Sequence, residues 1–384
     1  MKKRICILCM MAVFATALFC GCGNNAGEEN NSQNKGQVSQ SEKENTQTTE
    51  KNTEQIMTES TENSETKETE SSIEDFSMFF TGDILLKNAV VADYETEGLN
   101  SIISEYLESE MNEADLTMVN EEFPFSTRGT QAPDKQFTFR INPSYVSVFQ
   151  DMGVDVVSLA NNHALDYGKE ALLDSFSTLD EAGIPYVGAG ETKERAEEAI
   201  FVESGGRTVG VLSASRVIPV VGWNIENEQP GLFCTYDSTR LVQRIKETKE
   251  QCDYVVVYVH WGLERKTYPE EYQRQLAMEY IDAGADLVVG NHAHVPQGIE
   301  YYKDVPIVYC LGNFIFNEDM VDTYALKVLW DTEGKTTLQI LPVGITDYDT
   351  YELEGQERSE FIHYLEGISF DVSIDENGYV SKKQ

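Results

Sequence analysis

The chain contains an apolar run that ends in Gly290-Asn291-His292-Ala293-His294, and this ending constrains the fold more than any other feature. A strand that stops at Gly290 places two imidazoles on one loop at its carboxyl end. Only five histidines occur in the chain, and His163 and His260 also end hydrophobic segments. Open α/β sheets bind ligands at the carboxyl ends of their strands, and imidazole is a common metal ligand. The pattern therefore favours one shared site over four unrelated core or loop histidines.

Predicted strands alternate with predicted helices after residue 73. The predicted strands are 75–83, 115–120, 154–160, 254–260 and 286–290, and the predicted helices are 99–111, 143–152, 169–182, 239–249, 270–283 and 359–365. Hairpins are expected over 199–213, 298–311 and 325–341. This alternation predicts a layered α/β domain, and we assign residues 73–384 to it as a single domain.

Residues 1–72 differ in composition from the rest of the chain. A basic start, Met1-Lys2-Lys3-Arg4, precedes an apolar run over 5–19 that is short for a membrane span and typical of a signal peptide. The run ends in Phe19-Cys20-Gly21-Cys22, which resembles the lipobox of bacterial lipoproteins, with Cys22 as the residue to be acylated. An ordinary signal peptide or an uncleaved anchor is the alternative.

Residues 23–72 contain almost no aliphatic or aromatic side chains, so they cannot bury enough surface to offset their chain entropy. We predict a lipoprotein signal peptide over 1–22 and a disordered polar and acidic tether over 23–72. The expected location is the cell membrane, with the domain lipid-anchored on the extracytoplasmic face.

The formal net charge of −37 limits the partners of the chain. Such a surface repels nucleic acid and anionic lipid, so a nucleic-acid partner is not expected. A polyanionic substrate would need cations gathered locally. Arg128, Arg140 and Arg216 lie in or beside the irregular segments 123–140 and 217–233, and we expect them to pair with a carboxylate or phosphate.

Carboxylate, amide and imidazole groups stand where the predicted strands end. They are Asp83, Glu121 or Glu122, Asn162, His163, His260, His292 and His294. This set has no thiolate and suits a hard or borderline divalent ion, and a shared carboxylate could bridge a pair of ions. Neighbouring strand residues alternate sides, so Glu122 is expected to face the site and Glu121 to face away. Asp83 as a helix cap and Asn162 as a turn residue are the structural alternatives.

Six segments, in order, resemble the motifs of the CapA (PgsA-like) poly-γ-glutamate capsule synthesis proteins. They are Thr81-Gly82-Asp83, Asn120-Glu121-Glu122, Ala160-Asn161-Asn162-His163, His260-Trp261-Gly262-Leu263-Glu264, Gly290-Asn291-His292-Ala293-His294-Val295 and Leu311-Gly312-Asn313-Phe314. The resemblance covers residues 77–317. Because that family belongs to the calcineurin-like metallophosphatase superfamily, it implies a four-layer α/β/β/α sandwich.

The resemblance also implies a role for each residue. The implied ligands are Asp83 and His294 for one metal ion and Asn162, His260 and His292 for the other, with Glu122 between them. His163 would be a catalytic residue that donates a proton. Leu85 stands where the wider phosphatase pattern has a histidine, so the number of divalent ions, one or two of Mn, Fe, Zn or similar, stays open.

These features predict a surface-anchored lipoprotein that acts in synthesis, export or attachment of poly-γ-glutamate or a similar anionic polymer through a divalent-metal site. One alternative is a metal-dependent phosphoesterase that hydrolyses a phosphoester substrate, with His163 as the acid. The other is a non-catalytic scaffold for membrane-bound capsule synthase subunits. Whether the protein is an enzyme is left open at this point.

Overall fold

The computed structural model describes residues 6–7, 73–316, 321–346 and 348–383. Cys22 and the segment 23–72 lie outside the described residues, so lipidation and the tether stay predictions. Within the predicted signal peptide, a short strand β1 (Cys6–Ile7) pairs antiparallel with β7 (Ile200–Ser204). Among the described ranges, no helix has the length and apolarity needed to cross a membrane.

One sheet is built around β2 (Phe76–Ile84), whose nine residues are all buried. Its other strands are β3 (Leu116–Glu121), β4 (Val156–Ser158), β5 (Tyr186–Val187), β14 (Asn313–Ile315), β15 (Thr323–Trp330), β16 (Thr336–Thr346), β17 (Asp349–Glu352), β18 (Val372–Ile374) and β19 (Tyr379–Lys382). The order is β18-β19-β16-β15-β2-β3-β4-β5, with β14 on β2 and β17 on β16. The run from β2 to β5 is parallel, so its carboxyl ends meet at one edge.

The second sheet is built around β10 (Tyr254–His260), which is also fully buried. Its other strands are β1, β7, β8 (Arg207–Ser215), β11 (Leu287–Asn291), β12 (Gln297–Tyr302) and β13 (Val305–Cys310). The order is β1-β7-β8-β10-β11-β13-β12, and the run from β8 to β13 is parallel. Separately, β6 (Ala189–Gly190) pairs with β9 (Gly231–Leu232).

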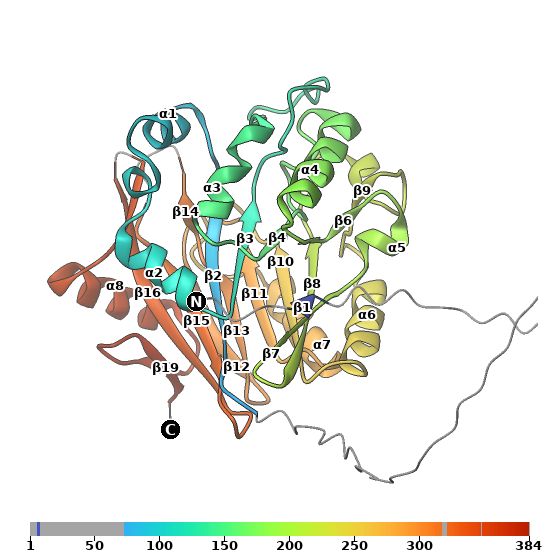
Figure 1. Ribbon diagram of the computed structural model, residues 1–384. Helices are drawn as coiled ribbons and strands as arrows, with labels where there is room; N and C mark the ends of the chain where they lie inside the picture. The colour runs from blue at the N-terminus through green and yellow to red at the C-terminus, as the bar shows by residue number, and fades with distance from the viewer. Residues whose placement is uncertain (1–5, 8–72, 317–320, 347, 384) are drawn as a thin grey trace, which may run out of the picture. The chain divides into compact units, whose positions relative to one another are not determined.

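Most helices cover the outer faces of the two sheets, and the last one instead packs on strands of both sheets and adds its apolar side chains to the layer between them. The helices are α1 (Asn88–Glu97), α2 (Glu105–Glu113), α3 (Val146–Asp151), α4 (Gly168–Ala182), α5 (Lys193–Ala196), α6 (Thr239–Lys249), α7 (Glu271–Ala283) and α8 (Gly355–Ile368), with single 3-10 turns η1 (Leu99–Ser101), η2 (Pro143–Tyr145) and η3 (Val221–Trp223). Figure 1 shows α1 to α4 on the side of β2 and β3, and α6 and α7 beside β8 and β10.

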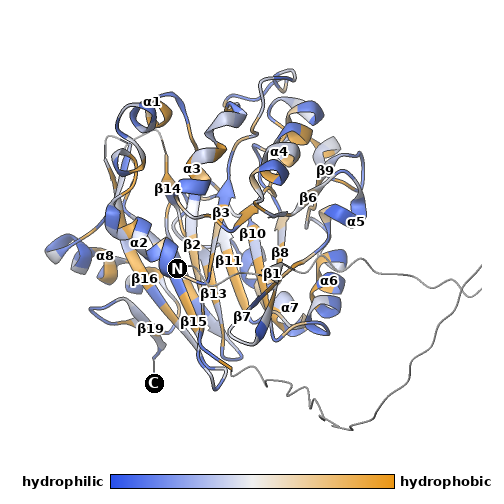
Figure 2. Ribbon diagram, in the orientation of Figure 1, coloured by the Kyte–Doolittle hydropathy of each residue, from blue (hydrophilic) through white to orange (hydrophobic). Residues whose placement is uncertain are grey.

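Three buried apolar layers separate these elements. The middle layer lies between the two sheets, where the Phe80 ring of β2 stacks on the Tyr258 ring of β10 with centroids 6.4 Å apart. One outer layer packs α1 to α4 on the β2 sheet, and the other packs α6 and α7 on the β10 sheet. Figure 2 shows the hydrophobic residues gathered on the strands. The expected four-layer α/β/β/α sandwich is confirmed.

The predicted helix over 99–111 is wrong in its bounds. Leu99–Ser101 form only the turn η1, and α2 begins at Glu105 because the Ser104 side chain caps it by accepting from the Leu107 N–H. A separate helix, α1, precedes them. The final helix is longer than the predicted 359–365, since α8 starts at Gly355.

Candidate metal centre

The six predicted ligands lie where strands of both sheets end. Asp83 is in β2, Glu122 follows β3, Asn162 follows β4, His260 ends β10, and His292 and His294 follow β11. Two polar contacts join the sheets: the Tyr258 hydroxyl donates to the Thr81 carbonyl at 3.2 Å, and the Ser158 and Ser213 hydroxyls lie 2.8 Å apart. The carboxyl edges of the two sheets therefore face one another, and the ligands meet between them.

The backbone around the two adjacent histidines is held in an unusual conformation. A Cβ at Gly290 would collide with the Tyr309 carbonyl and the Trp261 ring, so only glycine allows this close approach. His292 and His294 adopt positive φ angles of 102° and 55°. Each such residue costs on the order of 1–3 kcal/mol, and such strain gathers at functional sites.

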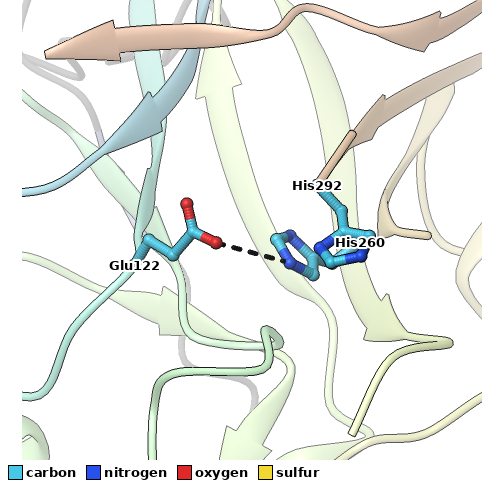
Figure 3. A group of neighbouring side chains, drawn as sticks. All are labelled: Glu122, His260 and His292. Atoms are coloured by element: carbon cyan, nitrogen blue, oxygen red, sulfur yellow. Dashed lines mark ion pairs between the residues drawn. The ribbon is translucent and has the colours of Figure 1, made fainter. Parts of the chain in front are cut away.

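The ligand atoms form two groups that share Glu122, each with atoms within 4.8 Å of one another. The deep group is Glu122, His260 and His292, all buried, and Figure 3 shows the carboxylate directed at the imidazoles. The outer group is Asp83, Glu122 and His294, of which the His294 side chain is 11% exposed. Glu122 Oε1 lies 3.8 Å from His260 Nε2 and 3.9 Å from His294 Nε2. Asp83 and His294 therefore lie in one group and His260 and His292 in the other, and metal binding by these groups stays a prediction.

Asn162 accompanies the deep group. Its Oδ1 accepts a hydrogen bond from His260 Nε2 at 2.7 Å. Glu121 belongs to neither group and lies near Ser175, although it is as buried as Glu122.

The deep group contains buried polar atoms that the described residues leave without hydrogen bonds. These are both carboxylate oxygens of Glu122 and the Nδ1 atoms of His260 and His292. Burial, and then the charge of Asp83, raise the pKa of Glu122 well above its usual range. Burial lowers the pKa of His260 well below its usual range and that of His292 to about 3. A buried carboxylate facing neutral imidazoles lacks a positive charge, so these residues fit a cation.

The outer group is better satisfied by protein atoms. Asp83 accepts from Asn120 Nδ2 at 2.8 Å and from the His292 N–H at 3.3 Å. His294 Nδ1 lies 2.8 Å from Asn313 Oδ1 and 3.6 Å from Asp83 Oδ2. Burial raises the pKa of Asp83 to about 6, against the opposing effect of His294. Oxygen and nitrogen donors without thiolate suit a divalent ion of the Mn, Fe or Zn kind in both groups.

Comparison with known proteins gives the family. The model of the family described as "Bacterial capsule synthesis protein PGA_cap" matches residues 77–318. The chain belongs to this family. The "PGA biosynthesis protein CapA" of Bacillus subtilis (strain 168) is 34% identical over 274 residues, covering 70% of this chain and 71% of that protein. The "Capsule biosynthesis protein CapA" of Bacillus anthracis is 31% identical over 286 residues, covering 71% and 68%. The expected CapA-type family is confirmed.

Solved structures with similar folds are more distant. A hypothetical protein from Thermus thermophilus has a TM-score of 0.44 and 18% identity, covering 73% of this chain and all of that one. The sulfate thiohydrolase SoxB of the same genus has a TM-score of 0.39 and 17% identity, covering 66% and 42%.

In this capsule synthesis family member, His163 lies beside the ligand groups and is held by residues that the sequence did not single out. Its Nδ1 lies 2.7 Å from Asp166 Oδ2 and 2.9 Å from Lys135 Nζ. The Phe139 ring packs on the imidazole with centroids 4.6 Å apart. Asp166 also accepts from the Phe139 N–H, so it ties the segment 123–140 to the site. The spacing of three residues between His163 and Asp166 is the only local signal of this pair.

A cavity of about 310 Å³ opens beside the deep group, and none of the three predicted substrate arginines lines it. Arg128 is exposed and paired with Asp174 at 2.5 Å. Arg140 stacks on Tyr167 with its guanidinium 4.1 Å from the ring centre. Arg216 lies between Tyr236 and Tyr272, 4.9 and 5.0 Å from the two ring centres. Their role in substrate binding stays a prediction.

Proposed function

We propose that this protein acts in the synthesis, export or attachment of poly-γ-glutamate or a similar anionic polymer through a divalent-metal centre. Membership of the capsule synthesis family and the names of its relatives support the polymer. The apolar run over 5–19 and the lipobox-like ending at Cys22 support a lipid anchor on the extracytoplasmic face of the membrane. Membrane-bound capsule synthase subunits are the proposed protein partners.

The observation that carries the metal is the unsatisfied carboxylate of Glu122 in the deep group. Glu122, His260, His292 and Asn162 would hold one ion, and Asp83, Glu122 and His294 would hold a second. When bound, a divalent ion supplies a concentrated positive charge that polarises an oxygen of the substrate.

The protein's own residues prepare the rest of the site. The 2.7 Å hydrogen bond between Asn162 Oδ1 and His260 Nε2 keeps these two proposed ligands side by side in the absence of an ion. Asp166 fixes the His163 ring through its contact with Nδ1, which leaves the other ring nitrogen of His163 available for a ligand in the cavity. The positive-φ backbone at His292 and His294 places both imidazoles at the ligand groups between the sheets.

Phosphoester hydrolysis is a second candidate, and His163 favours it. A histidine oriented by a carboxylate and lining a cavity next to metal ligands is placed to exchange a proton with a leaving group. The same residue has no role in a scaffold that performs no chemistry.

Metal analysis of wild type, His260→Ala and His363→Ala tests the centre. His363 is the matched control because it is exposed on α8 and hydrogen-bonds only to the Ser359 carbonyl among the described residues. We expect wild type and His363→Ala to hold metal and His260→Ala to lose it. Equal metal content in all three would contradict the proposal. Turnover of an activated phosphodiester that disappears in His163→Ala while metal remains would favour the hydrolase.

A further inference from the structure

The cavity beside the deep group has a lining of two kinds. Its apolar lining comes from Phe137 and the segment 217–219, and its polar lining comes from Lys135, Gln136, Asn162, His163, Glu264 and His292. Lys135 and Phe137 lie in the irregular segment 123–140, whereas Val217, Ile218 and Pro219 lie in the other irregular segment. Two segments distant in sequence therefore shape one binding space, with a cation on one of them.

Lys135 is the cation in this lining, and part of its hydrogen-bonding capacity is left over. Its Nζ donates to the Asn162 carbonyl at 2.5 Å and forms an ion pair with Asp166. Asp166 Oδ2 already accepts from the Phe139 N–H, and His163 Nδ1 is the donor in its short contact with this oxygen. A protonated Nδ1 cannot accept from Lys135. The third Nζ hydrogen of the ammonium is therefore available to a ligand.

We propose that Lys135 binds a carboxylate of the polymer and that Val217, Ile218 and Pro219 contact the methylene groups next to it. This inference rests on the proposed function, because the carboxylate belongs to the polymer proposed there. It also assigns the anion-binding role to a lysine rather than to Arg128, Arg140 or Arg216, which point to partners outside the cavity.

The two kinds of lining suit a particular class of ligand. In a γ-linked glutamate chain, each free carboxylate is followed by a short methylene spacer within the backbone. When the carboxylate pairs with Lys135, the methylene spacer contacts the apolar segment 217–219. One residue of the polymer then uses both the polar and the apolar lining.

Glu264 favours a ligand group that carries one negative charge over a group that carries two. It lines the same cavity, and its carboxylate is exposed. Asp166 already offsets the charge of Lys135 through their ion pair. A singly charged carboxylate fits this balance, whereas a doubly charged phosphate monoester meets repulsion from Glu264.

The test uses the full-length protein with its metal content measured, and a synthetic γ-linked glutamate oligomer as the probe in isothermal titration calorimetry. Lys135→Met is expected to weaken binding about tenfold, as loss of a charged hydrogen bond does, with metal content unchanged. Lys169→Met is the matched control, because Lys169 lies on α4 and pairs with Glu228 at the surface. It should bind the oligomer as wild type does.

A second variant keeps the test decisive if loss of the Lys135–Asp166 pair prevents folding. Ile218→Ser leaves that pair intact and should weaken binding of the γ-linked oligomer about threefold, because it removes apolar contact. Unchanged binding in Ile218→Ser and in a folded Lys135→Met, with metal retained, would overturn the inference and leave the metal centre standing. A wild-type protein that holds no metal would overturn the proposed function instead.

Discussion

The deep and outer ligand groups share Glu122 but differ in how the protein satisfies them. In the deep group, Glu122, His260 and His292 have buried atoms that no described residue hydrogen-bonds. In the outer group, Asp83 is bound by Asn120, and His294 lies within hydrogen-bond distance of Asn313. Unsatisfied buried polar atoms are costly, so the deep group gains more from a cation than the outer group does.

This difference indicates that two groups with similar ligand types can differ in their affinity for metal. Asp83 and His294 of the outer group already have hydrogen-bond partners without metal, and the His294 imidazole reaches solvent. We therefore expect tight binding at the deep group and weaker, exchangeable binding at the outer group. Three measurements test this comparison.

Substitution of the shared carboxylate has the largest expected effect. Glu122→Gln removes a negatively charged ligand that both groups share. Metal affinity should therefore fall more than about 100-fold at both groups, because loss of a residue that only orients a ligand already costs about 10- to 100-fold. Elemental analysis after dialysis against weak chelator measures this. Glu121→Gln is the matched control, because Glu121 is equally buried and belongs to neither group. Metal retained in Glu122→Gln would show that the two groups do not share a ligand.

Asn313→Ala should separate the groups. Asn313 Oδ1 lies 2.8 Å from His294 Nδ1 and fixes the orientation of that ring alone. Loss of such a partner costs about 10- to 100-fold in metal affinity, and the loss should be confined to the outer group. Competition titration with a chelator resolves two binding steps, and the deep step is the internal control. A parallel loss in both steps would contradict independent groups.

The pH dependence of the metal-free protein gives the smallest expected effect. Burial raises the pKa of Asp83 from 3.8 to about 6, so the folded state holds this proton at pH values where the unfolded chain has lost it. The contribution of Asp83 to stability is therefore present at low pH and is lost as the pH rises through about 6. Asp83→Asn removes it. Urea unfolding should show this variant gaining on wild type by on the order of 2 kcal/mol more at pH 7.5 than at pH 4.5. The same difference at both pH values would mean that Asp83 is not the group responsible.

The strand ends that carry the ligands could be predicted from the sequence. Buried parallel strands read as continuous apolar runs, and β10 matches its predicted range of 254–260. Side-chain alternation was enough to choose Glu122 over Glu121, because Glu121 ends β3 and Glu122 comes directly after it. These features depend on local pattern, which a single sequence contains.

Other features depend on contacts between distant residues, so no local sequence pattern predicts them. Lys135 contacts Asp166 across 31 positions, and Asn120 binds Asp83 across 37. The helix α1 lacks a side-chain cap at Lys87 and buries only Val90, so it has neither of the usual signals of a helix. Arg128, Arg140 and Arg216 were predicted to bind substrate from their charge alone. In the structure Arg128 pairs with Asp174, and the other two stack on aromatic rings.

Neither sheet holds a complete ligand group. The carboxylates Asp83 and Glu122 come from the β2 sheet, and the imidazoles of His260, His292 and His294 come from the β10 sheet. An ion held by both would act as a cross-link between segments that are distant in the chain. Because only the docked sheets can bind it, the free metal concentration around the protein would set how firmly the two halves of the sandwich stay together.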